Sequence, residues 1–159
     1  MNTVVATPAR PRSAKVLAWV IFALAAAGIV LSTFSLIHHY RTDPTEFCDI
    51  GEAFNCDIVN RSIYSSIGPV PVAGIGMAGY LLFMFLAHLA YRRGVALIMF
   101  VLALGGLGFA LYLTYIEAYV LVVWCILCLG SLSMISLITL LSGWQVLRAR
   151  NVQRAELRS

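Results

Sequence analysis

Four long stretches without a charged residue, each apolar and long enough to cross a lipid bilayer, restrict this chain to few folds. They cover residues 16–37, 74–91, 95–115 and 120–141. A membrane-spanning helix needs about 20 predominantly apolar residues. Hydrophobic residues make up 61% of the 159-residue chain and charged residues 11%, so little sequence remains for a separate soluble domain. The sequence therefore predicts an all-α integral membrane protein, built as a bundle of four transmembrane helices in residues 16–143.

The basic residues are distributed unevenly about these four spans. Four spans place both chain ends and the turn between the second and third spans on one side, which holds nine of the 11 basic residues. These nine are Arg10, Arg12, Lys15, Arg92, Arg93, Arg148, Arg150, Arg154 and Arg158. Cytoplasmic loops carry such an excess. We therefore expect residues 1–15 and 144–159 to be basic cytoplasmic ends beside anionic lipid, with loop 38–73 on the periplasmic side of the inner membrane.

Two other interpretations of these features were weighed. The basic residues flank membrane spans, which argues against nucleic acid as a partner. Ala23, Ala25 and Ala27 offer small residues for signal-peptide cleavage, but the apolar run extends roughly ten residues beyond them, past the usual length of a signal core. We therefore favour a first helix that is retained in the membrane.

The polar loop and the turns suggest local structure. Residues 60–67 are expected to form a short helix capped by Asn60, lying on the membrane surface before Gly68 and Pro69 end it. Glu117 is expected in a solvated turn within an interfacial aromatic belt that contains Tyr112, Tyr115, Tyr119 and Trp124. The less favoured alternative is that Glu117 accepts protons near a redox site. Three glycines of the third span are expected to permit close helix packing. They are Gly105, Gly106 and Gly108.

The four cysteines form two pairs near the same membrane face. Cys48 and Cys56 lie in the polar loop, whereas Cys125 and Cys128 form a Cys-x-x-Cys pair that we place ~7 to 12 Å below the outer end of the fourth span. A spacing of three residues puts both thiols on one side of a helix. A helix amino terminus lowers a thiol pKa and apolar surroundings raise it, so the sequence leaves their balance open.

Several roles fit these cysteines. Buried cysteines often serve only as small packing residues, and a disulfide between Cys48 and Cys56 could be purely structural. The wide spacing of this loop pair does not match usual zinc motifs, so no metal is expected. Two cysteine pairs at two depths favour an electron relay instead. A soluble protein can reach the loop pair, and a lipid-soluble molecule can reach the embedded pair. Thiol–disulfide exchange moves two electrons at a time. A quinone is the expected final acceptor, since no haem, flavin or nucleotide motif is present.

These residues carry a resemblance to a known family. The quoted segments are Cys48-Asp49-Ile50-Gly51, Cys56, Ser62, Gly79-Tyr80 and Cys125-Ile126-Leu127-Cys128. In their order and spacing, over residues 16–143, the chain resembles the vitamin K epoxide reductase family, in particular small bacterial members that oxidise protein thiols. The resemblance implies a four-helix bundle around a quinone, with the outer loop and a short horizontal helix as a lid.

The resemblance also implies roles for individual residues. Cys48 would exchange with a thioredoxin-like partner, and Cys56 would pass electrons to Cys125. Cys128 would face the quinone. Ser62 and Tyr80 would lie near the quinone, and Asp49 would assist in the loop. Animal members place polar side chains near the quinone at positions that are Val72 and Leu132 here, which leaves the hydrogen bond to the quinone unassigned and argues against assuming vitamin K epoxide as substrate.

The expected function is therefore that of a membrane thiol:quinone oxidoreductase that supports disulfide formation. Its electron donor would be a separate periplasmic thioredoxin-like protein, since no fused domain is expected after Leu141, and its acceptor would be ubiquinone or menaquinone. One alternative is a non-catalytic membrane subunit with a structural loop disulfide. Another is the unrelated class of four-helix quinone-linked oxidases, which place Cys-x-x-Cys in the first outer loop and so reverse the order seen here.

Overall fold

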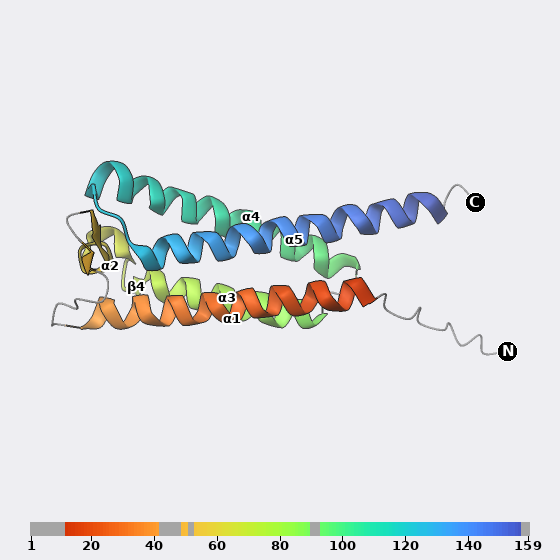
Figure 1. Ribbon diagram of the computed structural model, residues 1–159, viewed down its shortest axis with the longest axis horizontal. Coiled ribbons are helices and arrows are strands. Elements are labelled where there is room, and N and C mark those ends of the chain that lie inside the picture. The colour runs from red at the N-terminus through yellow and green to blue at the C-terminus, as the bar shows by residue number, and fades with distance from the viewer. Residues whose placement is uncertain (1–11, 42–48, 51–52, 90–92, 157–159) are drawn as a thin grey trace.

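Four long helices dominate the computed structural model, which describes residues 12–41, 49–50, 53–89 and 93–156 (Figure 1). They are α1 (Arg12–Tyr40), α3 (Val72–Leu89), α4 (Arg93–Ile116) and α5 (Ile126–Glu156). Each contains a segment long and apolar enough to cross a membrane. The prediction of an all-α, four-span membrane protein is confirmed.

Two long helices that follow each other in the sequence, α3 and α4, make little contact in the bundle. Helix α1 lies along both α3 and α5, and α4 lies along α5, whereas α3 and α4 contact each other little. The shared core includes Ile21 of α1, Tyr80 of α3, Met99 of α4 and Ile138 of α5, all buried. This arrangement leaves room between α3 and α4.

Short elements gather at the end of the bundle where α1 ends and α3 begins (Figure 1). Strand β1 (Asp49–Ile50) pairs antiparallel with β2 (Phe54–Asn55), and α2 (Cys56–Arg61) follows directly. After η2 (Ile63–Ser65), strands β3 (Ser66–Ile67) and β4 (Val70–Pro71) form a hairpin. Gly68 makes its turn with a φ of 61°, a conformation that favours glycine.

The expected helix over residues 60–67, capped by Asn60, was wrong in its position. Helix α2 begins at Cys56, and its cap is Asn55, whose side chain accepts a hydrogen bond from the Ile58 N–H at 3.0 Å. Asn55 has the extended backbone of a cap because it ends strand β2. The position of this helix therefore depends on a strand pair that the apolar pattern does not reveal.

The fourth span begins later than expected, at Ile126 instead of residue 120. One turn of π-helix, η3 (Glu117–Leu121), continues α4, and Val122 then takes a left-handed conformation with a φ of 55°. Cys125 consequently precedes the first residue of α5, and Cys128 lies in its first turn, not ~7 to 12 Å inside the span. At its other end α5 continues to Glu156, so much of the expected tail 144–159 is helical.

Among the described glycines, the tightest surroundings are at a glycine other than the three expected. A Cβ atom on Gly105 or Gly108 would meet nothing within 4 Å, and one on Gly106 would meet Ile135 only at 3.4 Å. A Cβ atom on Gly28 of α1 would instead lie 2.5 Å from the ring of Tyr80 on α3. Close packing of α1 on α3 therefore requires glycine at position 28.

Candidate functional site

The structure brings one cysteine of the loop to the Cys-x-x-Cys pair. Cys56 is disulfide-bonded, whereas Cys125 and Cys128 are free thiols. Cys56 and Cys125 are 1% and 0% exposed and belong to the same buried cluster at the end of the bundle where α1 ends and α3 begins. Cys48 lies outside the described residues.

Backbone hydrogen bonds hold the loop against the segment that enters α5. The Asn55 N–H donates to the Trp124 carbonyl at 3.0 Å, and the Trp124 N–H donates to the Ala53 carbonyl at 2.9 Å. Phe54 and Trp124 thus form a parallel bridge. The residues that precede Cys56 and Cys125 are joined directly. Sequence reasoning placed Trp124 in an aromatic belt and missed this bridge, since backbone pairing of single residues leaves no side-chain pattern.

Asn60 connects the two cysteines through its side chain. It is 6% exposed, and its Nδ2 donates to the Cys56 carbonyl at 3.0 Å and lies 3.9 Å from the Cys125 Sγ. Its Oδ1 accepts a hydrogen bond from Ser35 Oγ on α1 at 2.5 Å. Asn60 therefore joins α1, α2 and the start of α5 at the point where the two cysteine pairs meet.

Two histidines at the end of α1 also hold α2. His38 Nδ1 lies 3.0 Å from Asp57 Oδ1, and His39 Nδ1 lies 2.6 Å from the Asn60 carbonyl oxygen. His38 is 5% exposed, so its contact with Asp57 is largely shielded from solvent. With Ser35, these contacts fix α2 over the end of the bundle.

Glu117 is buried, and the expectation of a solvated turn residue was wrong. The side chain is 2% exposed, and its Oε2 accepts a hydrogen bond from the Cys125 N–H at 3.1 Å. A carboxylate oxygen of Glu117 and the sulfurs of Cys125 and Cys128 all lie within 4.8 Å of one another. The π-turn η3 and the left-handed Val122 fold the chain back so that Glu117 faces the cysteines.

The surroundings of Cys125 favour its thiolate. A hydrogen bond from the Cys128 side chain lowers the pKa of the Cys125 thiol below its ordinary value, although burial acts in the opposite direction. The Cys128 N–H also donates to the Cys125 Sγ at 3.3 Å. Hydrogen bonds to the charged form of an acid lower its pKa. The hydrogen bond from Cys128 therefore outweighs burial and lowers the pKa of Cys125, and it is an effect that the sequence analysis did not consider.

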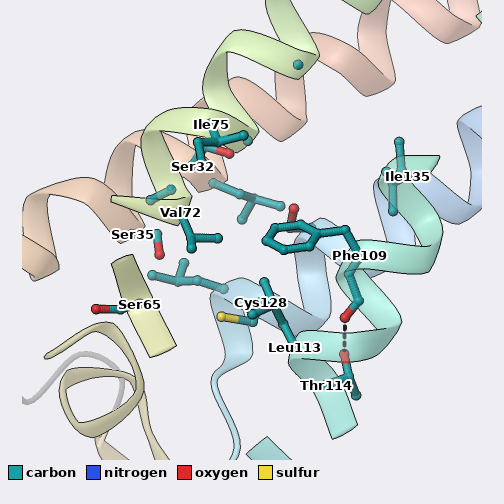
Figure 2. A pocket seen from close by; sticks show the side chains of 18 of the residues that line it. Ser32, Ser35, Ser65, Val72, Ile75, Phe109, Leu113, Thr114, Cys128 and Ile135 are labelled. Carbon is teal, nitrogen blue, oxygen red and sulfur yellow. Dashed lines mark hydrogen bonds between the residues drawn. The ribbon is translucent and has the colours of Figure 1, made fainter. Parts of the chain in front are cut away.

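A cavity of about 300 Å³ opens beside this cluster. It is lined by side chains from α1, α2, η2, α3, α4, η3 and α5 and occupies the space where α3 and α4 stay apart. Figure 2 shows the Cys128 sulfur, from α5, and the Phe109 ring, from α4, pointing into it. The walls are mainly apolar, and hydroxyl groups such as those of Ser35 and Ser65 interrupt them. A cavity of this size and character is typical of sites for small apolar molecules with a few polar atoms.

Three residues that the sequence analysis placed near a quinone line this cavity: Ser62, Tyr80 and Cys128. The Tyr80 hydroxyl lies 2.8 Å from the Ser131 carbonyl oxygen and 2.9 Å from its Oγ. Ser62 Oγ donates to the Val59 carbonyl at 2.8 Å. These bonds fix two hydroxyl groups in the wall of the cavity.

The other predicted positions are distributed as follows. Val72 lines the cavity, whereas Leu132 packs against the helix core. Asp49 belongs to β1, where its backbone pairs with Asn55. The apolar walls and scattered hydroxyls fit a quinone ring with its two carbonyl oxygens, and Cys128 is the thiol that such a ring would meet.

Comparison with known proteins gave one match. A model described as the vitamin K epoxide reductase family matches residues 19–142, which is most of the chain. No curated protein matched. The matched range contains all four cysteines and every residue that lines the cavity.

Proposed function

The chain belongs to the vitamin K epoxide reductase family, and from this premise we propose that it is a membrane thiol:quinone oxidoreductase that oxidises a periplasmic thioredoxin-like dithiol protein. Membership makes it an oxidoreductase of the membrane. One observation supports the finer assignment above all others. Cys56 and Cys125 share a buried cluster, and Cys128, three residues further on, opens onto an apolar cavity.

The first step takes electrons from the partner. A thiolate of the partner dithiol attacks Cys48 of a Cys48–Cys56 disulfide, forming a mixed disulfide and releasing Cys56 as a thiolate. The second thiol of the partner resolves this bond. The partner leaves as a disulfide, and the loop pair now holds two electrons.

The second step moves these electrons inward. The Cys56 thiolate attacks Cys125 of an oxidised Cys125–Cys128 pair, and Cys128 leaves. Cys48 then attacks Cys56, Cys125 leaves as a thiolate, and the Cys125–Cys128 pair takes up the two protons that the partner dithiol has lost. A thiol of low pKa leaves faster, so the lowered pKa of Cys125 favours this resolution. The described state, with Cys56 disulfide-bonded and Cys125 and Cys128 reduced, corresponds to the end of this step.

The third step delivers the electrons to a quinone in the cavity. The Cys125–Cys128 disulfide re-forms as two electrons and two protons pass to the quinone, which leaves as the quinol. In sum, the partner dithiol and a quinone give a partner disulfide and a quinol. The acceptor is ubiquinone or menaquinone, and the enzyme works in the inner membrane with both termini in the cytoplasm and the cysteines on the periplasmic side.

Quinone absorbance tests this function. The purified full chain in detergent is mixed with a reduced thioredoxin-like dithiol protein and ubiquinone or menaquinone, for the wild type and Cys128→Ala. We expect the wild type to reduce the quinone and Cys128→Ala to lose this activity while still exchanging with the partner. Cys56→Ala and Cys125→Ala should each stop the relay and accumulate mixed disulfides. Full activity in both, or no reduction of either quinone together with inert Cys125 and Cys128, would overturn the proposal.

A further inference from the structure

Glu117 is a buried acid at the point where the thiols meet the cavity. Its carboxylate and the sulfurs of Cys125 and Cys128 lie within 4.8 Å of one another, and the residue also lines the cavity wall. One oxygen accepts the Cys125 N–H at 3.1 Å, which holds the carboxyl group beside the sulfurs. The side chain thus reaches both the group that is oxidised and the space beside it.

The proposed reaction has to move protons as well as electrons. Oxidation of two thiols to a disulfide releases two protons, and reduction of a quinone to a quinol consumes two. Cys125 is fully buried, so its proton has no direct access to water. Among the described residues that line the cavity, Glu117 is the only carboxylic acid. Proton transfer by a placed side chain accelerates such reactions by about 10²- to 10⁴-fold.

We propose that Glu117 carries protons from the Cys125–Cys128 dithiol to the quinone, an assignment that rests on the proposed function. The carboxylate takes the Cys128 proton as this sulfur becomes a thiolate. It releases that proton to a quinone oxygen as the electron pair leaves the dithiol and the S–S bond forms. The Cys125 proton follows the same route, so two protons and two electrons reach the quinol.

Three other titratable side chains of the described residues, outside the Cys-x-x-Cys pair, line the cavity, those of His39, Tyr64 and Tyr80. His39 of α1 lines the cavity, but its Nδ1 lies 2.6 Å from the Asn60 carbonyl oxygen. Tyr80 of α3 lines it too, with its hydroxyl bonded to Ser131. Cys125 and Cys128, at the start of α5, are the thiols being oxidised. Of the described His, Asp and Glu side chains, Glu117 alone has a ligand atom within 4.8 Å of both sulfurs, so it is the group placed to move their protons.

Glu117→Gln separates proton transfer from a structural role. Glutamine keeps an oxygen to accept the Cys125 N–H but cannot take up a thiol proton. The experiment uses the pre-reduced full chain in detergent, mixed with a short-chain ubiquinone, and follows a single turnover of quinone reduction at several pH values. Glu117→Asp keeps the carboxyl group, and Glu156→Gln removes a carboxylate at the last residue of α5 as a control.

We expect Glu117→Gln to slow quinone reduction by about 10²-fold at neutral pH. The deficit should shrink as the pH rises, because solvent can then deprotonate Cys128, which is only half-buried, without Glu117. Glu117→Asp should recover most of the rate, and Glu156→Gln should match the wild type. A Glu117→Gln protein that keeps both thiols, unfolds at the wild-type temperature and turns over at the wild-type rate would overturn this inference alone. Failure of the wild type to reduce quinone would instead overturn the proposed function.

Discussion

Asn60 links the two cysteine pairs, and its loss should slow one half of the reaction more than the other. Its amide nitrogen contacts the Cys56 carbonyl and the Cys125 sulfur, and Ser35 holds its oxygen. Asn60→Ala should slow transfer from Cys56 to Cys125 by at least about tenfold, because misplacement by ~1 Å can cost about 10²-fold. Quinone reduction by pre-reduced protein needs no such transfer and should fall less, because there Asn60 acts only as one residue of the cavity wall.

Rapid-mixing measurements of the two half-reactions check this prediction. Asn151→Ala, an exposed position far along α5, is the matched control. Asn60→Ala also leaves buried hydrogen-bond partners of Asn60 unsatisfied, at a cost of about 1–3 kcal/mol each. The unfolding temperature of Asn60→Ala should therefore fall. Equal slowing of both half-reactions would argue for general damage in place of misalignment.

The hydrogen bond from Cys128 should be visible in the pH dependence of Cys125. Because this bond lowers the pKa of Cys125, a larger fraction of the thiol is ionised at a given pH than in an ordinary cysteine. In a background with Cys48 and Cys56 replaced by alanine, alkylation of Cys125 should therefore begin at lower pH than for free cysteine. Cys128→Ala removes the bond and should move the profile to higher pH, whereas Cys128→Ser keeps a hydroxyl donor and should move it less.

Mass spectrometry of the alkylated protein, quenched at timed intervals, gives these profiles. The same profile in all three proteins would show that Cys128 does not set the ionisation of Cys125. The comparison is made at constant ionic strength, because salt screens charges near the surface more than buried ones.

Residue types and spacing predicted part of this site. The cysteine pairs were singled out by their type and spacing, whereas Ser62 and Tyr80 were placed near the quinone by the family resemblance; these last two line the cavity with Cys128. From the sequence, Asn60 was expected only as a helix cap, and Glu117 was expected as a solvated turn residue in preference to a proton acceptor. One polar residue between apolar runs is ordinarily solvated, and only the fold shows that both are buried against the cysteines.

At the scale of elements, the contact of α1 with α3 depends on Gly28. A methyl group there would overlap the Tyr80 ring, and overpacking of this kind costs about 1–3 kcal/mol. Gly28→Ala should lower the unfolding temperature and raise the KM for quinone, because Tyr80 also lines the cavity. Gly105→Ala on α4 meets no atom within 4 Å and should be neutral or stabilising by up to about 1 kcal/mol.

Thermal unfolding in detergent and steady-state quinone reduction measure these two effects. An unfolding temperature for Gly28→Ala equal to that of Gly105→Ala would show that α1 and α3 can separate at little cost. A changed unfolding temperature with an unchanged KM would show that Tyr80 does not shape the quinone site.

Hydropathy located the first three spans to within a few residues. The expected ranges 16–37, 74–91 and 95–115 compare with the long helices α1, α3 and α4. It failed at the start of α5 and at α2, where the polypeptide is arranged by the backbone bridge between Phe54 and Trp124 and by the π-turn. Such contacts join residues far apart in sequence and are independent of hydrophobicity, so a pattern along the chain does not contain them.

At the scale of the whole molecule, the distribution of basic residues predicts the orientation of the bundle across the membrane. Helix α5 ends in a basic segment with Arg148, Arg150 and Arg154, and the cysteine site lies at the other end of the bundle (Figure 1). We predict from the positive-inside rule that the cysteine end faces the periplasm. Ile63, which is 84% exposed in η2, and Arg150 of α5 are suitable reporters of the two ends.

Labelling of intact cells tests this orientation. In a background with all four cysteines replaced, Ile63→Cys should react with a membrane-impermeant maleimide in intact cells. Arg150→Cys should react only after lysis. The reverse pattern would invert the topology and place the cysteines in the cytoplasm.

The backbone bridge between residues 53–55 and Trp124 also affects the rate of transfer between the cysteine pairs. Because the fold holds the loop in place, Cys56 meets Cys125 at an effective concentration set by geometry and not by how many molecules share the membrane. In the proposed relay this internal transfer is therefore first order. Collision governs only the arrivals of the dithiol protein and the quinone. Diluting the enzyme in lipid should leave the transfer between its cysteine pairs unchanged, so that each molecule works as a complete unit.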